Sequence, residues 1–312
     1  MTQIIKKSLL TLSAILALTA FSQPTDTNNN PEAFPKGTVL QQSRIETEKV
    51  QWTQIQPGIQ YAQVSATQDG KEIELVNMLK IDPDMYNFDV HFDYNSKTVE
   101  EWQKSLDAEI IVNASYWEPD YTPTNNLVME GKRFIGQFPS LQESVMKNNK
   151  NKRHVGAFVT NPKQEDLAQA KVYSLEERAI DYSNPEWGEV VESYPMLVYE
   201  DETVREVQKD KWRANRTVIG THDDGDISIV TTQKGYFTMR EMGEFLNHPQ
   251  FEIHNALNLD GGIATELLID TDNLKMVQYG NFETNPEWKI GDIEGKRTIK
   301  IPIPSVIGVY KK

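Results

Sequence analysis

The sequence predicts an α+β fold with a mixed or antiparallel sheet at its core and helices flanking that sheet. Alternation of apolar and polar residues, the pattern of half-buried strands, recurs along most of the chain. Helix-start signals occur in two short segments. Because strands and helices follow no strict alternation, the pattern favours α+β over a doubly wound α/β fold.

The ordered part of the chain is expected to begin with a hairpin. Gly58 to Val64 alternates as a strand, Asp69-Gly70 is a turn dipeptide, and Glu72 to Ile81 forms the returning strand. Asn87 to Phe92 has the composition of a further strand.

A helix is expected next. Ser96 or Thr98 can cap its N-terminus, and two glutamates in the first turn suit the positive end of the helix dipole. Trp102 would lie on its apolar face. A short buried strand over 110–112 then ends at Asn113.

The middle of the chain is less regular and highly charged. We expect residues 141–192 to be a variable insertion, with an exposed loop from Lys147 to Lys152. Gln164 to Ala170 is expected to form a short helix, and Asn184 to Gly188 a turn.

Regular patterns return in the second half. Thr238 with Glu241 three residues later is a capping box, which predicts a helix there. The expected strands before it are Met196–Tyr199, Thr203–Val207, Arg216–Gly220 and Ile227–Thr232.

An apolar run after this helix ends in Asp260-Gly261-Gly262, and a second β-rich run follows. Two interpretations are open. Asp-Gly between two strands is the usual signal of a tight hairpin. Alternatively, the glycines let the backbone turn so that amide N–H groups face an anionic or sugar ligand.

Composition excludes several classes of protein. The chain has 312 residues, a formal net charge of -14 and no cysteine. A polyanionic surface lacks the electrostatic footprint of a nucleic-acid-binding protein. The absence of cysteine excludes disulfides, thiolate metal sites and a cysteine nucleophile. The length allows one large domain or two ordinary ones, with a sizeable core.

The N-terminus resembles a targeting segment. Lys6-Lys7 precede an apolar stretch from Ser8 to Thr19, and small residues flank Phe21 before a probable cleavage point. The apolar stretch is short for a membrane span. We therefore expect a signal peptide over 1–22, no stable membrane insertion, and an exported protein, periplasmic or secreted.

The remaining chain divides into an arm and a domain. Residues 23–48 are polar and rich in Asn, Pro and Thr, which predicts a flexible arm. Residues 49–312 are expected to form one domain.

Several segments occur along the chain in an order that matches a known family. They are Ile110-Ile111-Val112-Asn113, Tyr194-Pro195-Met196-Leu197-Val198, Arg216-Thr217-Val218-Ile219-Gly220, the capped helix at Thr238, and Ala256-Leu257-Asn258-Leu259-Asp260-Gly261-Gly262. This order resembles the phosphodiester glycosidase family, whose best-known members remove N-acetylglucosamine from a sugar phosphodiester. The resemblance covers roughly Trp52 to Tyr310 and implies that 49–312 is a single catalytic domain.

The chain departs from the family pattern in three places. The family usually continues Asp-Gly-Gly with Gly-Ser-Ser, where this chain has Ile263-Ala264-Thr265. It usually has Gly-Gly-Phe-Phe after the asparagine, where this chain has Ala114-Ser115-Tyr116-Trp117. It tends to place Asp-Gly after the strand that ends at Val230, where this chain has Thr231-Thr232-Gln233.

Cleavage of a glycosyl phosphodiester sets the expected catalytic residues. The phosphate leaves as an anion, so it needs cationic or N–H donors more than a strong acid. Arg216 is expected to hold the phosphate, since a guanidinium binds phosphate through two N–H groups. Asp260 is expected at the glycosyl centre, as nucleophile or as base for water. The alternatives are a surface ion pair for Arg216 and a turn-capping role for Asp260.

Further residues are expected to bind the substrate. Asn113 can bond a sugar group or orient Asp260, or it can be a turn residue. The loop itself contributes the N–H groups of Gly261 and Gly262 and the hydroxyl of Thr265, which is otherwise an ordinary strand residue. Trp117 can stack on a sugar ring or belong to the core or its rim. The role of Glu266 as a second carboxylate stays open.

Metal dependence is left open by the sequence, with calcium or magnesium as the candidate cations. No His-x-x-x-His or Glu-x-x-His pattern occurs. Asp223-Asp224-Gly225-Asp226 resembles the start of a calcium loop but lacks the distal glutamate, so a solvated hairpin is favoured. The expected partner is a carbohydrate or sugar phosphate. A non-catalytic glycan-binding or cell-surface polysaccharide accessory protein on the same fold is the alternative function, and the oligomeric state is unknown.

Overall fold

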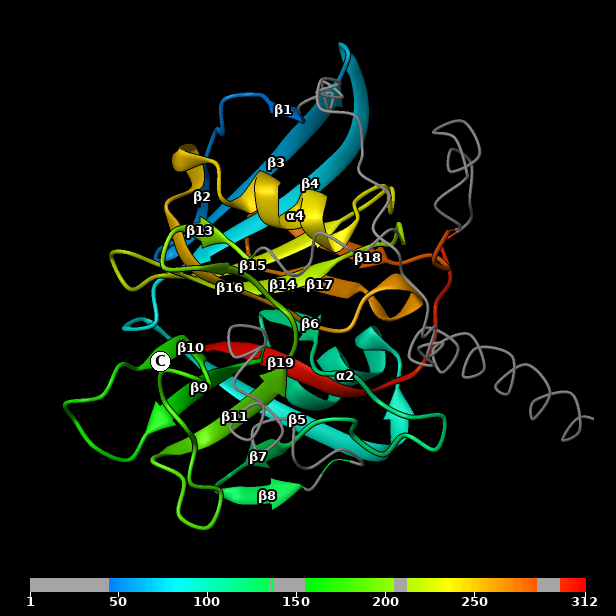
Figure 1. Ribbon diagram of the computed structural model, residues 1–312. Coiled ribbons are helices and arrows are strands. Elements are labelled where there is room, and N and C mark those ends of the chain that lie inside the picture. Colours follow the sequence, from blue (N-terminus) through cyan, green and yellow to red (C-terminus); the bar gives the residue numbers. More distant parts are fainter. Residues whose placement is uncertain (1–44, 135, 137–154, 205–211, 285–297) are drawn as a thin grey trace, which may run out of the picture.

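Three antiparallel sheets make up the computed structural model, which describes residues 45–134, 136, 155–204, 212–284 and 298–312. Figure 1 shows them stacked, with the N-terminal strands at the top of the view and the green strands of the middle of the chain at the bottom. No helix in the described residues is long and apolar enough to cross a membrane.

The large sheet has the strand order β1-β3-β4-β15-β14-β16-β12-β13, and β2 also pairs with β3. All its pairings are antiparallel. Its strands are β1 (Glu46–Thr47), β2 (Thr53–Gln56), β3 (Ile59–Gln68), β4 (Lys71–Ile81), β12 (Met196–Tyr199), β13 (Glu202–Thr203), β14 (Thr217–His222), β15 (Ile227–Thr232) and β16 (Ile253–Asn258).

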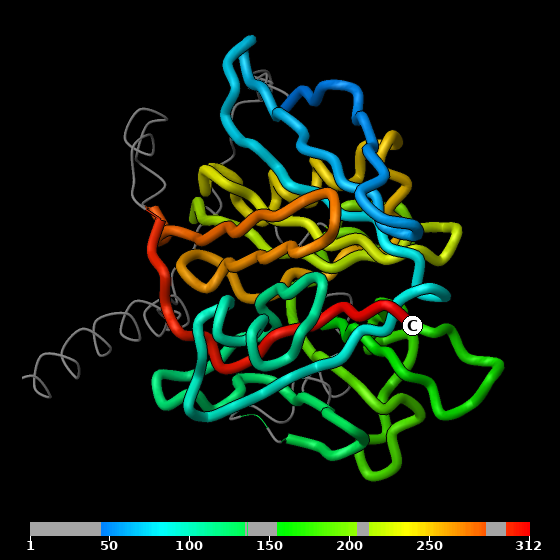
Figure 2. Tube along the Cα trace, turned by 180° about the vertical axis from the view of Figure 1, so that it is seen from behind, coloured from blue at the N-terminus to red at the C-terminus, as the bar shows by residue number. Residues whose placement is uncertain are grey.

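Two smaller sheets complete the fold. The β6 sheet has the order β18-β17-β6-β19-β5, and the β9 sheet has the order β10-β9-β11-β7-β8. Figure 2 shows β5 and β19 side by side in the β6 sheet. The strands of the β6 sheet are β5 (Tyr86–Lys97), β6 (Ile110–Asn113), β17 (Glu266–Asp270), β18 (Lys275–Tyr279) and β19 (Ile303–Lys311). Those of the β9 sheet are β7 (Leu127–Met129), β8 (Lys132–Phe134), β9 (Gly156–Pro162), β10 (Ala170–Ser174) and β11 (Trp187–Ser193).

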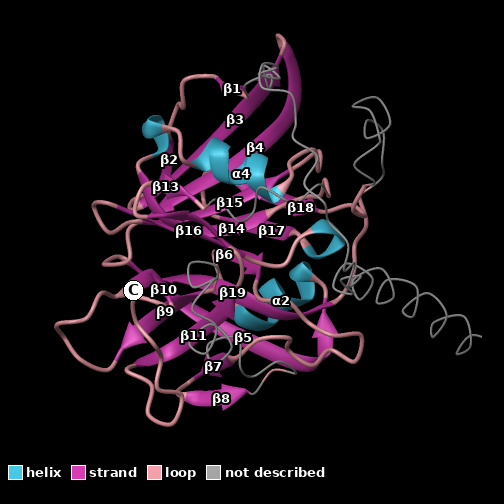
Figure 3. Cartoon of the chain, in the orientation of Figure 1, coloured by secondary structure: helices cyan, strands magenta, loops and turns pink. Residues whose placement is uncertain are grey.

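The predicted α+β class is wrong, because strands dominate the described chain and no parallel pairing occurs among the described strands (Figure 3). The α-helices of the described residues are α2 (Val99–Leu106) and α4 (Met239–Leu246), each of eight residues. Two 3-10 turns of three residues each, η3 (Pro249–Phe251) and η4 (Gly262–Ala264), add little to the helical content. The apolar strand faces are covered mainly by other strands, so few helices are needed to bury the core.

The central core lies between the sheets. Its buried side chains come from all three sheets, for example Leu79 of the large sheet, Val112 of the β6 sheet and Phe158 of the β9 sheet. Helix α4 packs Met242 and Phe245 against the other face of the large sheet, and α2 packs against the β6 sheet in a separate cluster. The helices therefore seal outer faces and do not form the core.

Most local predictions are confirmed in the first half of the chain. β3 and β4 form the expected hairpin, and Asp69 and Gly70 have φ values of 52° and 72°, as a two-residue hairpin turn requires. β5 is the expected third strand. Thr98 caps α2 and forms a capping box with Glu101.

In the second half, β12, β14 and β15 lie where strands are expected, and Thr238 and Glu241 form the predicted capping box of α4. The helix expected over 164–170 is wrong. That segment is a turn that leads into β10, because it offers only Leu167 as a sizeable apolar side chain and has no face to bury. Residues 205–207 and the loop at 147–152 lie outside the described residues.

The Asp-Gly hairpin interpretation is also wrong. β16 pairs with β14 and β12 in the large sheet, whereas β17 pairs with β6 and β18 in the β6 sheet. Residues 259–265 therefore carry the chain from one sheet to another. This crossing brings the end of β16 beside the end of β6.

A buried carboxylate fixes the loop between β15 and α4. Glu74 of β4 is fully buried, and its Oε1 accepts N–H bonds from Leu75, Gln233 and Lys234, while Oε2 accepts one from Tyr236 at 2.7 Å. The same loop leads to Phe237, whose carbonyl accepts a bond from Arg216. Glu74 thus stabilises the loop on which Arg216 depends.

We expect Glu74→Gln to lower the free energy of unfolding by about 1–3 kcal/mol, because an amide NH2 would face a backbone N–H that needs an acceptor. Urea unfolding at pH 8 measures the effect. The exposed neighbour Glu72, which pairs with Lys234, is the matched control, and Glu72→Gln should change stability by less than about 1 kcal/mol. Equal stabilities of the two variants would contradict the role given to Glu74.

Candidate active site

The candidate site lies where four strand ends meet. Val218 of β14 is paired with Asn258 of β16, and Val112 of β6 is paired with Leu267 of β17. The segment that crosses between the sheets runs from the end of β16 to the start of β17, so it passes the ends of β6 and β14. Asn113, Thr217 and Asp260, which are far apart in the sequence, meet at this point.

Asn113 joins these strand ends through its side chain. Its Nδ2 donates to the Asp260 carbonyl at 2.8 Å. Its Oδ1 accepts from the Thr217 hydroxyl at 2.8 Å and from the Glu266 N–H at 3.1 Å. Asn113 is buried and bonds three other segments, and its bond to Asp260 is to the backbone carbonyl and not to the carboxyl group.

Asp260 retains some solvent exposure as a residue, but its carboxyl group is buried among protein atoms. Its Oδ1 accepts the N–H of Gly261 at 2.8 Å. Burial raises the pKa of Asp260 to about 8, and the nearby charge of Glu283 adds to the rise. Asp260 is therefore a poorly solvated carboxyl group whose pKa lies near physiological pH.

The glycines after Asp260 act differently from the prediction. Their N–H groups, expected to face a ligand, bond the protein: Gly261 donates to Asp260, and Gly262 donates to the Asn215 carbonyl at 2.8 Å. Gly262 has a φ of 60°, and a Cβ on Gly261 would lie 2.8 Å from the Asn215 oxygen. The glycines are needed for close backbone packing, which places Asp260.

Arg216 is buried, with 2% of its surface exposed. Its Nε donates to the Phe237 carbonyl at 3.1 Å, and one Nη donates to the Trp212 carbonyl at 2.6 Å. The Nε and one Nη of the guanidinium therefore donate to backbone carbonyls of the protein. The position of Arg216 favours a long-range effect of its positive charge over the two-pronged grip that the sequence predicts.

Thr265 and Trp117 were expected to bind the substrate. Thr265 is fully buried and its hydroxyl lies 3.3 Å from that of Thr217, so it belongs to the packed base of the site. Trp117 is half-buried and packs against Tyr121 with ring centroids 5.3 Å apart. Trp117 lies beside Tyr116, at the partly exposed side of the site.

Two tyrosines and an asparagine at the site were not found from the sequence. Tyr116 and Tyr194 pack with ring centroids 5.1 Å apart, and the Tyr116 hydroxyl accepts a bond from Asn258. Burial raises the pKa of Tyr194 to about 12, and the charge of Asp260 contributes. Tyr116 lies within a segment that departs from the family pattern, whereas Tyr194 and Asn258 lie within segments that match it. Their places in these segments were the signals available.

The carboxylate beside Asp260 is Glu283 and not Glu266. A Cβ on Gly262 would lie 4.0 Å from a Glu283 carboxylate oxygen, and the charge of Glu283 raises the pKa of Asp260. Glu266 is fully buried elsewhere, where the N–H of Ile301 reaches its Oε1 at 3.4 Å. Strand alternation turns the Glu266 side chain toward the α2 side of the β6 sheet, near Glu100.

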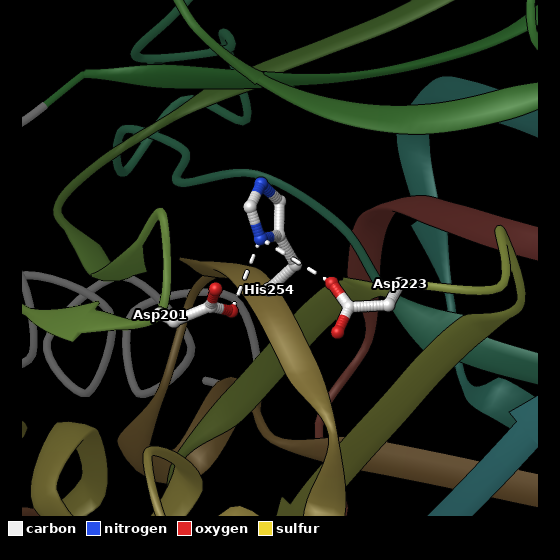
Figure 4. A group of neighbouring side chains, drawn as sticks. All are labelled: Asp201, Asp223 and His254. Atoms are coloured by element: carbon white, nitrogen blue, oxygen red, sulfur yellow. Dashed lines mark hydrogen bonds and ion pairs between the residues drawn. The ribbon is translucent and has the colours of Figure 1, made fainter.

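One group of side chains in the described residues could hold a metal ion by its chemistry: Asp201, Asp223 and His254 (Figure 4). His254 Nδ1 lies 3.0 Å from Asp201 Oδ1 and 3.5 Å from Asp223 Oδ1. Both carboxylates are well exposed, so the contacts are those of a surface histidine with two acids. No sequence pattern shows this group, because its members come from three separate segments.

This group lies at the opposite end of the large sheet from Asp260. His254 is four residues before Asn258 on β16, and Asp223 is six residues after Thr217 on the neighbouring strand. At about 3.3 Å per residue, the separation from the candidate site is about 13–20 Å. A cation held there would not contact Asp260. The neighbouring Asp224 and Asp226 pair with Lys80, as in the expected solvated hairpin.

Comparisons with known proteins place the chain among phosphodiester glycosidases. Residues 107–310 match a family model described as phosphodiester glycosidase. A search of curated proteins finds no match.

Solved structures share the fold. The catalytic domain of zebrafish N-acetylglucosamine-1-phosphodiester alpha-N-acetylglucosaminidase, auto-inhibited by its pro-peptide, aligns with a TM-score of 0.52 at 14% identity, over 86% of this chain and 88% of that one. A hypothetical protein from Synechocystis aligns with a TM-score of 0.50 at 12% identity, over 85% of this chain. The present chain spans 64% of that second protein's length. At these identities the likeness establishes the fold.

The buried Glu266 predicts a pH-dependent stability. Burial raises the pKa of Glu266 from 4.5 to about 8. Between these values the unfolded chain releases the proton that the folded protein keeps, so the free energy of unfolding falls as pH rises through this window. We expect Glu266→Gln, which carries no charge, to flatten this fall and to be more stable than the wild type at pH 8.5.

Urea unfolding at pH 5 and pH 8.5 checks this expectation. Glu244→Gln, a change at an exposed residue of α4, is the control and should follow the wild-type pH dependence. Parallel curves for the wild type and Glu266→Gln would show that Glu266 is ionised in the folded protein and would contradict the prediction.

Proposed function

This chain belongs to the phosphodiester glycosidase family, and from that premise we propose that it is an exported hydrolase that cleaves a glycosyl phosphodiester on the sugar side. The observation that carries the proposal is the position of Asp260. Asn113 and two glycines hold its backbone at a junction of two sheets, where the residue keeps some solvent exposure and burial keeps its carboxyl group poorly solvated. A carboxylate so placed can act at the anomeric carbon as nucleophile or as base for water.

Glu283 supports the assignment of a glycosidase. Most glycosidases use two carboxyl groups around the scissile bond, and Glu283 is the one whose charge acts on Asp260. A phosphate leaving group needs less protonation than an alcohol, so the second carboxyl group can serve the water or the sugar hydroxyls.

Arg216 is proposed to favour the departing phosphate through its charge. It stays buried and bonded to two carbonyl groups, so its position changes little when a ligand binds. A fixed positive charge in a poorly solvated position stabilises negative charge that develops nearby in the transition state.

Export, the domain division and the substrate also belong to this proposal. The basic and apolar N-terminal residues support a cleaved signal peptide over 1–22 and an arm over 23–48, and the enzyme domain would be 49–312. The alternative function is a glycan-binding protein without turnover, which the altered residues after Gly262 favour. The two functions differ in one measurable property, which is bond cleavage.

We expect the protein to release N-acetylglucosamine from a benzyl diester of α-N-acetylglucosamine 1-phosphate. In ¹⁸O-labelled water the label should enter the sugar and not the phosphate, because the bond broken is that between C1 and oxygen. Asp260→Asn should lower kcat by at least about 1,000-fold, since the amide can serve neither as nucleophile nor as base. Label in the phosphate would indicate a phosphodiesterase, and binding without release would indicate the accessory protein.

The pH dependence of the same reaction tests the ionisation of Asp260. If its carboxylate is the reacting form, kcat/KM should rise about tenfold per pH unit below a pKa of about 8 and level off above it. The diester phosphate stays ionised over this range, so it adds no titration. A rate that falls above pH 8 would instead assign Asp260 as a proton donor.

A further inference from the structure

We propose that the hydroxyl of Tyr116 donates a hydrogen bond to the oxygen that joins sugar and phosphate in the substrate. This inference rests on the proposed function and adds a catalytic residue to it. Three features of the site carry it: the orientation of the Asn258 amide, the hydrogen bonds that place the hydroxyl beside the strand end leading into Asp260, and the fixed backbone and ring of the tyrosine.

The Asn258 amide determines which way the tyrosine hydrogen bond runs. One side-chain atom of Asn258 lies 2.5 Å from the Tyr116 hydroxyl and 2.6 Å from the Leu259 carbonyl oxygen. A second carbonyl oxygen at 2.6 Å from Leu259 would be repelled, so this atom must be the NH2 nitrogen. Asn258 therefore donates to Tyr116, and the hydroxyl oxygen is the acceptor.

The hydroxyl proton of Tyr116 is consequently left for another acceptor. Within the described residues no group accepts it, although a phenol can donate one bond while it accepts another. The backbone of Tyr116 is fixed, because its carbonyl accepts the N–H of Thr124 at 2.8 Å, and its ring packs on Tyr194. The donor is thus held in place before any ligand binds.

Its position matches the bond that the proposed reaction breaks. Asn258, which bonds the Tyr116 hydroxyl, is the last residue of β16 before the segment that carries Asp260. The N–H of Leu259 donates to the carbonyl of Thr217, the residue after Arg216, at 2.9 Å, and the N–H of Asp260 donates to the Ala114 carbonyl at 3.2 Å. The hydroxyl therefore lies at the strand ends that hold the group assigned to the sugar and the one assigned to the phosphate. Burial raises the pKa of Tyr116 well above its usual value, so the phenol stays protonated over the working pH range. Tyr116 as a residue keeps some exposure to solvent.

The chemical step follows from these facts. The bond between C1 and the bridging oxygen breaks, and its electron pair stays on that oxygen. C1 bonds either to water, whose proton passes to the Asp260 carboxylate, or to Asp260 itself, in which case water then cleaves the resulting ester and releases the sugar. The oxygen becomes part of a phosphate monoester anion. Tyr116 shares its proton with this oxygen and does not transfer it, because a phenol is a far weaker acid than the phosphate. The hydrogen bond from Tyr116 stabilises the negative charge that develops on the bridging oxygen in the transition state.

The test is Tyr116→Phe, which removes the hydroxyl and keeps the ring that packs on Tyr194. With the benzyl diester of α-N-acetylglucosamine 1-phosphate, we expect kcat to fall by about 10- to 100-fold and KM to change by less than about threefold. The pH profile of kcat/KM should keep its midpoint, because Tyr116 does not titrate in the pH range of that measurement. Tyr86→Phe, which removes a hydroxyl bonded to the Pro57 carbonyl, is the matched control and should leave kcat unchanged.

Site-specific incorporation of 3-fluorotyrosine at position 116 separates a hydrogen-bonding role from a structural one. The fluorinated phenol keeps the shape of the ring and is a stronger donor, so it should retain kcat or raise it, whereas Tyr116→Phe loses it. Equal kcat and KM for wild type and Tyr116→Phe would overturn the inference and leave the proposed function standing.

If the wild type cleaves no diester, the proposed function fails and binding decides the inference. Titration calorimetry with α-N-acetylglucosamine 1-phosphate should then give a Kd at least about fivefold weaker for Tyr116→Phe than for the wild type and Tyr86→Phe. Equal affinity, or no binding by the wild type, would overturn the inference as well.

Discussion

The hydrogen bonds of the Asn113 side chain are the constraint on which the rest of the site depends. This buried amide at the end of β6 bonds Thr217 of β14, the N–H of Glu266 on β17, and the carbonyl of Asp260. It thereby joins the large sheet and the β6 sheet at the point where the chain crosses between them. A buried amide left without these partners would cost free energy, so the crossing and the position of Asp260 are fixed together.

Close backbone packing around this junction explains why glycines follow Asp260. Gly261 lies against the Asn215 carbonyl, and a Cβ on Gly280 would meet the Gly262 oxygen at 1.9 Å. Side chains larger than hydrogen would push the crossing segment outward. Asp260 would then leave the surroundings that raise its pKa. The glycines thus act on the chemistry of the carboxyl group through packing, and their own N–H groups are used by the protein.

The site combines a floor of buried, hydrogen-bonded residues with other residues that keep some exposure to solvent. Asn113, Arg216 and Thr265 are buried and bonded to protein groups, whereas Tyr116 and Asp260 are partly exposed. Preorganised polar groups of this kind cost no rearrangement when charge develops during a reaction. Glu74 extends the arrangement, because it holds the loop whose Phe237 carbonyl receives the Arg216 guanidinium.

The sequence by itself determined the local structure and the family. Alternation located β3, β4 and β5, a candidate N-cap with two first-turn glutamates located α2, a capping box located α4, and the Asp260 motif marked the candidate site. These signals depend on neighbours in the chain. Alternation shows that one face of a strand is buried but not what covers it, so the sequence could not exclude helices as the covering layer. Which carboxylate lies beside Asp260, and that Tyr116 and Asn258 join it, depended on pairing between distant strands. Only the tertiary structure decided these contacts, since residues such as Asn113 and Glu283 carry no mark of their partners in the sequence.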